Sequence, residues 1–144
     1  MALKQISVFV ENKAGKLSEF TRVLWERNVG LKAFSLADTR DFGVLRIIVD
    51  DPVQTSAILQ EEGYAFSITK VVAVAIQDSP GSLHRIITIL GNEGINIEYS
   101  YAFTQKGRGL SYMILRVEDD ERAERVLAEH HVDLIDLMAL ETCD

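Results

Sequence analysis

The sequence contains a single cysteine, only two prolines and no long run of apolar residues. The lone Cys143 excludes an internal disulfide and any metal site made of several cysteines. No apolar stretch is long enough to span a bilayer, and no cleavable leader is recognisable at the N-terminus. These absences predict a cytoplasmic protein that is not inserted in a membrane.

Positive charge is also scarce, with 15 Lys and Arg residues against 22 Asp and Glu residues and a formal net charge of −7. Binding to nucleic acid or to an anionic membrane surface requires basic patches. The composition therefore argues against both kinds of partner. Apolar residues make up 47% of the 144 residues, which is enough to pack one ordinary domain or two small ones.

Sequence motifs of common catalytic sites are absent. The chain has neither a Gly-x-Ser-x-Gly turn nor a Gly-Lys-Ser/Thr phosphate loop. His130 and His131 lack the spaced partners of a zinc site and stand near a predicted helix end, where a cation is favoured. The acidic clusters Asp50-Asp51 and 118–121 precede predicted helices, so they are interpreted as caps. The sequence predicts no enzyme, no cofactor and no metal.

The chain repeats itself with a shift of 66 residues. The matched positions are alternating apolar residues followed by a glycine and a leucine: Ile6, Val8, Val10, Gly15 and Leu17 correspond to Val72, Val74, Ile76, Gly81 and Leu83. After a two-residue insertion in the second copy the shift becomes 68, and Val49 corresponds to Val117. A repeat of about 70 residues predicts two domains, 1–69 and 70–144.

Within each copy, strand and helix periodicities alternate in the order strand, helix, strand, strand, helix, strand. The later predicted strands are 31–37, 44–50, 64–69, 95–104, 110–118 and 133–140, and the second helices are 52–61 and 120–130. This order predicts the α+β class, with two ferredoxin-like units that each have an antiparallel sheet and helices on one face. The join at residues 68–72 has no flexible linker, which favours two units packed together.

The first strand-to-helix turn of each copy is a candidate binding site. In the second copy it reads Asp78-Ser79-Pro80-Gly81-Ser82-Leu83. Pro80 suits the first position of a helix, and Gly81 leaves the backbone open to a ligand. The N–H groups of Gly81, Ser82 and Leu83 are then expected to be unpaired at the positive end of a helix, where a carboxylate binds. Asp78 is placed to hold a positive group, so the turn suggests an amino acid as ligand.

The first copy repeats this turn as Asn12-Lys13-Ala14-Gly15-Lys16-Leu17. The second strands are entered by Asn28-Val29-Gly30-Leu31 and Gly94-Ile95-Asn96-Ile97. These motifs closely resemble the ACT domain, and the resemblance covers nearly the whole chain as a stand-alone tandem ACT protein. It implies a non-catalytic regulatory protein that binds a free amino acid at interfaces between paired units.

The resemblance also implies that paired units join side by side through their second strands. Each ligand then lies between the turn of one unit and the second-strand entry of the other, and a crosswise pairing gives two unequal sites. One site combines the Asn12–Leu17 turn with Asn96 and Ile97. The other combines the Asp78–Leu83 turn with Gly30 and Leu31, which would leave room for a ligand side chain. Lys13 and Lys16 depart from the small residues usual in this loop.

Several alternatives stay open. Asn12, Asp78 or Ser79 could simply cap the helix that follows. The chain could be an assembly module that dimerises or holds an enzyme subunit without a ligand. It could also be a small isomerase or lyase that uses Asp78 and His84, although His84 is better explained as an exposed helix residue. A regulatory protein of this kind needs a partner, either a regulated enzyme or a transcriptional protein, and unpaired second strands favour a homodimer.

Overall fold

The computed structural model describes residues 3–38, 42–77, 79–104 and 110–135. The chain divides into two compact units, with the boundary between Thr69 and Lys70. The N-terminal unit ends at Thr69, and the C-terminal unit begins at Lys70. Each unit has its own pair of helices and its own hydrophobic core.

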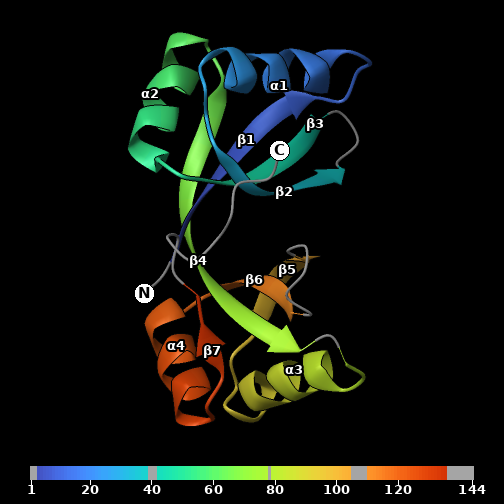
Figure 1. Cartoon of the computed structure of the whole chain (residues 1–144), viewed down its shortest axis with the longest axis vertical. Helices are drawn as coiled ribbons and strands as arrows, with labels where there is room; N and C mark the ends of the chain where they lie inside the picture. The colour runs from blue at the N-terminus through green and yellow to red at the C-terminus, as the bar shows by residue number, and fades with distance from the viewer. Residues whose placement is uncertain (1–2, 39–41, 78, 105–109, 136–144) are drawn as a thin grey trace. The chain divides into compact units, whose positions relative to one another are not determined.

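The N-terminal unit contains β1 (Leu3–Glu11), α1 (Lys16–Glu26), β2 (Leu31–Asp38), β3 (Phe42–Val49), α2 (Pro52–Glu61) and the first part of β4 (Ala65–Gln77). Its strands are ordered β2-β3-β1-β4, and β3 pairs antiparallel with both β1 and β2. Alternate side chains of β1 and β3 pack against both helices in one core: Ile6, Val8, Val10, Phe20, Leu24, Leu45, Ile47, Val49 and Leu59. Both helices therefore cover the same face of the sheet (Figure 1).

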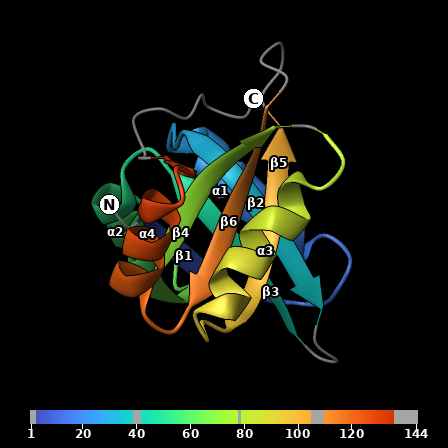
Figure 2. The ribbon, with the colours of Figure 1, turned by 90° about the horizontal axis from the view of Figure 1, so that it is seen from below.

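The C-terminal unit contains the second part of β4, α3 (Ser82–Asn92), β5 (Ile97–Thr104), β6 (Leu110–Val117), α4 (Asp120–Glu129) and β7 (Asp133–Leu134). Its strands are ordered β5-β6-β4-β7, which repeats the order of the first unit. Helices α3 and α4 lie over these strands (Figure 2), and their core side chains are Ile86, Ile89, Leu90, Ala123, Val126 and Leu127. The predicted α+β class and the predicted element order are confirmed in both units.

Two strands differ most from the prediction. The sequence suggests separate strands on either side of the join, whereas β4 is one continuous strand of 13 residues. No glycine or proline interrupts the stretch from Ala65 to Gln77, so the extended backbone continues through the boundary. The last strand was expected over 133–140. β7 is Asp133–Leu134, and the rest of that range lies outside the described residues.

Helices α2 and α4 begin with aspartate caps. The carboxylate of Asp51 accepts a hydrogen bond from the backbone N–H of Gln54 at 3.0 Å, and that of Asp119 accepts one from Arg122 at 3.1 Å. The interpretation of the acidic clusters as helix caps is confirmed for Asp51 and Asp119. None of the helices in the described stretches is both long and apolar enough to cross a membrane.

Helices α1 and α3 begin instead after glycines in the left-handed region, with φ of 87° at Gly15 and 90° at Gly81. The prediction that Pro80 takes the first helical position is wrong. A left-handed residue at Gly81 cannot belong to a right-handed helix, so α3 starts at Ser82. A β-carbon added at either glycine would meet no other atom within 4 Å, so only the backbone conformation requires glycine here.

Replacing Gly81 by alanine is expected to destabilise the protein by about 1–2 kcal/mol, because a β-carbon disfavours the left-handed conformation by that amount. Gly91 is the matched control. It lies inside α3 with open space around it, so Gly91→Ala should stabilise the protein by about 0.5–1 kcal/mol. Urea unfolding followed by circular dichroism measures both effects. Stabilisation by Gly81→Ala would contradict the role assigned to the left-handed turn.

Candidate functional site

The two strand-to-helix turns share one backbone structure. The N–H of Lys13 donates to the carbonyl of Glu11 at 2.9 Å, and the N–H of Ser79 donates to the carbonyl of Gln77 at 2.8 Å. These two bonds are related by the 66-residue shift of the repeat. The doubled sequence motif is therefore also a doubled local structure.

Backbone donors are free at the start of α1 and of α3 in the described part of the chain. Among them are the glycine and the leucine of each motif: the N–H groups of Gly15, Leu17, Gly81 and Leu83 have no hydrogen-bond partner there. The N–H of Ser82, in contrast, donates to the carbonyl of Ser79 at 3.3 Å, so the expectation that it is unpaired is wrong. Free donors at the positive end of a helix, beside a glycine with open space, can hold a carboxylate.

The side chains of the N-terminal turn are exposed. Lys13 and Lys16 form surface ion pairs with Glu11 at 3.2 Å and Glu19 at 3.6 Å, so both ammonium groups already face carboxylates of their own unit. Such exposed pairs contribute little to stability. Asn12 forms no side-chain cap of α1 in this structure, which leaves its amide available to a ligand.

Ser79 does not cap α3 either. Its hydroxyl lies 2.9 Å from the hydroxyl of Ser82, and the residue at the cap position is Gly81, which has no side chain. The capping alternative is therefore wrong for Ser79, as it is for Asn12. Asp78 lies outside the described residues.

The two second-strand entries differ in chemistry. In the N-terminal unit the N–H of Gly30 donates to the carboxylate of Asp50 at 3.2 Å, and the N–H of Asp50 donates back to the carbonyl of Gly30 at 3.0 Å. A β-carbon at Gly30 would lie 2.5 Å from Oδ2 of Asp50. The space that the sequence suggested for a ligand side chain is thus occupied by Asp50. In the C-terminal unit the exposed Asn96 stands at the matching position, just before β5.

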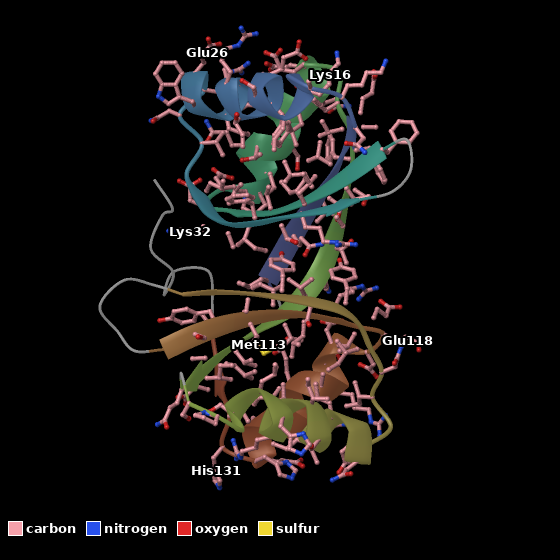
Figure 3. All side chains as sticks on the ribbon, turned by 90° about the vertical axis from the view of Figure 1, so that its right-hand side faces the viewer. Lys16, Glu26, Lys32, Met113, Glu118 and His131 are labelled. Atoms are coloured by element: carbon pink, nitrogen blue, oxygen red, sulfur yellow. The ribbon has the colours of Figure 1, made fainter. Side chains whose placement is uncertain are left out.

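Within one unit, the turn and the second-strand entry lie at opposite ends of the first helix. Lys16 and Glu26 lie at the two ends of helix α1 (Figure 3). Gly30 follows Glu26 in the chain, just before β2. Helix α3 separates the Gly81 turn from Asn96 in the same way. The first residues of β2 and β5 are Leu31 and Ile97. Neither unit by itself brings the two halves of the predicted site together.

A small cavity of about 60 Å³ lies beside the N-terminal turn. Asn12, Lys13 and Leu17 line it together with Leu36 of β2 and Gly43 of β3. The structure therefore brings three predicted site residues together. The sequence interpretation missed the other four lining residues, which are Val10 and Glu11 at the end of β1 and the more distant Leu36 and Gly43. Leu36 and Gly43 lie on other strands, so only the strand register could have revealed them. Gly43, for example, pairs with Val10 at the end of β1.

An apolar groove separates the first helix from the edge strand of each unit. In the N-terminal unit the groove is lined by Leu17, Phe20, Thr21, Leu24, Leu31, Phe34, Leu45 and Ile47. In the C-terminal unit the lining is Ile76, Leu83, Ile87, Ser100, Tyr101, Ala102, Ser111 and Met113. Leu17 and Leu83 thus belong both to the turns and to these grooves. Among the edge-strand residues of these grooves, Leu31 is a predicted site residue, whereas Phe34, Ser100 and Ala102 were missed. Their strand partners are the core residues Ile47, Leu115 and Met113, which places them on the helix-covered face.

Histidine positions agree with structural roles. His84 is exposed, with Nε2 3.3 Å from the hydroxyl of Thr88 one turn further along α3. His130 ends α4 with Nδ1 2.9 Å from the carbonyl of Val126, which confirms the predicted cap. Across the described ranges, no three His, Cys, Asp or Glu side chains gather closely enough to hold a metal ion.

Comparisons with known proteins agree with this architecture. The family model of the ACT domain pair matches residues 1–143. A crystal structure of a protein from Bacteroides thetaiotaomicron is 38% identical, with a TM-score of 0.88 over 94% of this chain and 92% of that chain. No curated protein matches the sequence.

Two regulatory subunits of aspartate kinase have the same fold. The subunit from Thermus thermophilus, in a ligand-free form, is 17% identical with a TM-score of 0.61, covering 88% of this chain and 91% of that chain. The subunit from Thermus flavus is 16% identical with a TM-score of 0.60, covering 89% and 92%. At this level of identity the likeness shows the fold alone.

The resemblance noted from the turn motifs is confirmed by the match over nearly the whole chain. The structure agrees with this match, because it contains two βαββαβ units and each unit has a left-handed glycine before its first helix. An ACT domain pair is a regulatory module, and its units are not catalytic domains. The chain belongs to the ACT domain pair family.

Proposed function

We propose that the protein binds a free amino acid between ACT units and passes this signal to a partner protein. The observation that carries the proposal is the pair of free N–H groups at the start of α1 and α3, beside a glycine with open space. These groups would hold the ligand carboxylate at the positive helix end. The amide of Asn12 or the carboxylate of Asp78 would hold the ammonium.

The second half of each site would come from a second copy of the chain. Turn and second-strand entry lie at opposite ends of one helix, so a ligand that touches both needs two units. β2 and β5 are the end strands of their units, and in the described part of the chain they pair only with β3 and β6. An unpaired edge bordered by exposed apolar side chains favours pairing with another chain, which supports a homodimer.

Side-chain sizes favour the pairing of unlike units. On β2, Phe34 is 60% exposed and Leu36 is 50% exposed. The matching positions of β5 are the small residues Ser100 and Ala102. A bulky edge fills space better against a small edge than against another bulky edge. We therefore propose that the N-terminal unit of one copy pairs with the C-terminal unit of the other.

This pairing makes the two sites unequal. One would offer the amides of Asn12 and Asn96 to the ligand. The other would join the Asp78 turn to Gly30, where Asp50 already fills the space and adds negative charge. The Asn12–Asn96 site is therefore expected to fill first. A ligand with so few heavy atoms should bind with an affinity of about 1 µM to 1 mM, or roughly −8 to −4 kcal/mol.

The activity that ligand binding regulates would belong to a separate protein in the cytoplasm. Regulatory subunits of aspartate kinase share this fold, which supports an enzyme as the regulated partner over a transcriptional protein. Ligand that bridges two chains stabilises the paired state and shifts whatever depends on pairing. The competing function is an assembly module with empty sites, which the exposed apolar edge of β2 would equally serve.

Calorimetric titration with each of the standard amino acids tests the binding proposal. Asn96→Ala removes one hydrogen bond to a charged ligand and should weaken binding about 10- to 100-fold. Asn92→Ala is the matched control, because Asn92 is exposed at the end of α3 and outside the proposed site. No binding of any amino acid at millimolar concentration, or equal losses in the two variants, would contradict the proposal.

Pairing through β2 is tested by Phe34→Asp, which places a charge in the apolar edge. The dissociation constant of the dimer, measured by sedimentation at several concentrations, should rise at least about tenfold. Val53→Asp is the control, because Val53 is 76% exposed on α2 and away from the edge strand. A dimer that tolerates Phe34→Asp as well as Val53→Asp would exclude this edge as the interface.

A further inference from the structure

A second cavity of the C-terminal unit lies on a different face of α3 from the apolar groove. It has a volume of about 320 Å³ and is lined by the end of β4, the first turn of α3 and the start of β7. Ser82, Arg85 and Ile86 face this cavity, whereas Leu83 and Ile87 line the groove beside β5. We call it the Arg85 cavity. All its lining residues belong to the C-terminal unit, so it does not depend on pairing.

Arg85 is held in place but not neutralised. Its Nη2 donates to the backbone carbonyl of His130 at 2.6 Å, which satisfies one carbonyl at the end of α4. Within the described residues no carboxylate forms an ion pair with it. A guanidinium has five N–H donors, so the bond to His130 leaves donors that can reach a ligand in the cavity.

Asp133 lines the same cavity from β7. In the described part of the chain it forms no ion pair with Arg85 or with His131, which also lines the cavity. The side chains of Arg85 and Asp133 are both exposed, so each charge is hydrated and needs no partner within the protein. Their separation leaves room for a molecule that carries both charges, and Ser82 and Gln77 add neutral polar groups to the lining.

The matching cavity of the N-terminal unit shows that the fold does not dictate these charges. It has a volume of about 410 Å³, and it has Glu19 where the other has Arg85. Ala65 replaces Asp133, and Lys16 replaces Ser82. There Lys16 and Glu19 pair with each other at 3.6 Å. The arrangement of separated opposite charges is therefore particular to the C-terminal unit.

We propose that the Arg85 cavity is a second binding site, for a small zwitterion with a carboxylate and an ammonium group. The guanidinium of Arg85 binds the carboxylate, and Asp133 binds the ammonium. A volume of about 320 Å³ is at the lower end of the range for small-molecule sites, which fits a ligand of free amino acid size. This site is distinct from the turn donors, because Gly81 and Leu83 are not among its lining residues.

The test uses the full chain titrated with each standard amino acid, followed by amide NMR and calorimetry. Acetate and methylamine serve as probes with a single charge. We expect at least one amino acid to shift the amide signals around Arg85 and Asp133 and to bind at least about tenfold more tightly than either probe. An acetate affinity equal to that of the amino acids would overturn the zwitterion site in favour of a simple anion site.

Arg85→Gln and Asp133→Asn should each weaken this binding at least about tenfold. Asp133→Asn keeps the size of the side chain and does not touch the bond between Arg85 and His130, so it separates ligand contact from folding. Glu19→Gln is the matched control in the N-terminal unit and should leave the affinity unchanged. Equal losses in Asp133→Asn and Glu19→Gln would contradict the proposal.

The double variant Asn12→Ala/Asn96→Ala separates this site from the proposed site between units. It should retain the shifts around Arg85 and Asp133 while the shifts at the Gly15 turn disappear. Loss of both sets of shifts in this variant would overturn an independent second site. The proposal of a site in the Arg85 cavity would also be overturned if no amino acid shifted the amide signals around Arg85 in the unmodified chain, even if the signals at the turns shifted.

Discussion

The left-handed glycine before the first helix of each unit is the constraint on which the binding surface depends. Because Gly15 and Gly81 have positive φ, the backbone turns sharply from strand to helix in each unit, and none of the described side chains caps the helix start. Helices α2 and α4 use their cap positions differently, since Asp51 and Asp119 satisfy N–H groups that a ligand would otherwise reach. The distinction between capped and open helix starts thus separates α2 and α4 from the two helices for which we propose a ligand.

The two copies keep one backbone and differ in the groups it carries. The turns have matching hydrogen bonds, and both second strands have a register shift one residue after they begin. On this common frame, Gly30 faces Asp50 in one unit while Asn96 is exposed in the other. Arg85 likewise takes the place of Glu19. The two copies therefore share the backbone elements that form the pockets, and the side chains that differ between the copies make the pockets chemically different.

Local patterns predicted the elements well because each depends on neighbours in sequence. The range 52–61 for α2 and the cap at Asp51 follow from residues within one or two turns. The misplaced Pro80 shows the limit, because the conformation of Gly81 decides where the helix starts. Contacts between distant residues could not be predicted. Asp50 reaches Gly30 across 20 residues, and the Arg85 cavity joins three elements that only the folded sheet brings together.

Helix α3 borders a cavity on two sides, and the two proposed sites therefore share this helix. Ser82 lines the Arg85 cavity, and the adjacent Leu83 lines the groove beside β5. Both follow Gly81, whose backbone sets the position of the whole first turn. If a ligand in the Arg85 cavity changes the free energy of pairing through β5, linkage requires that pairing change the affinity of the cavity by the same factor.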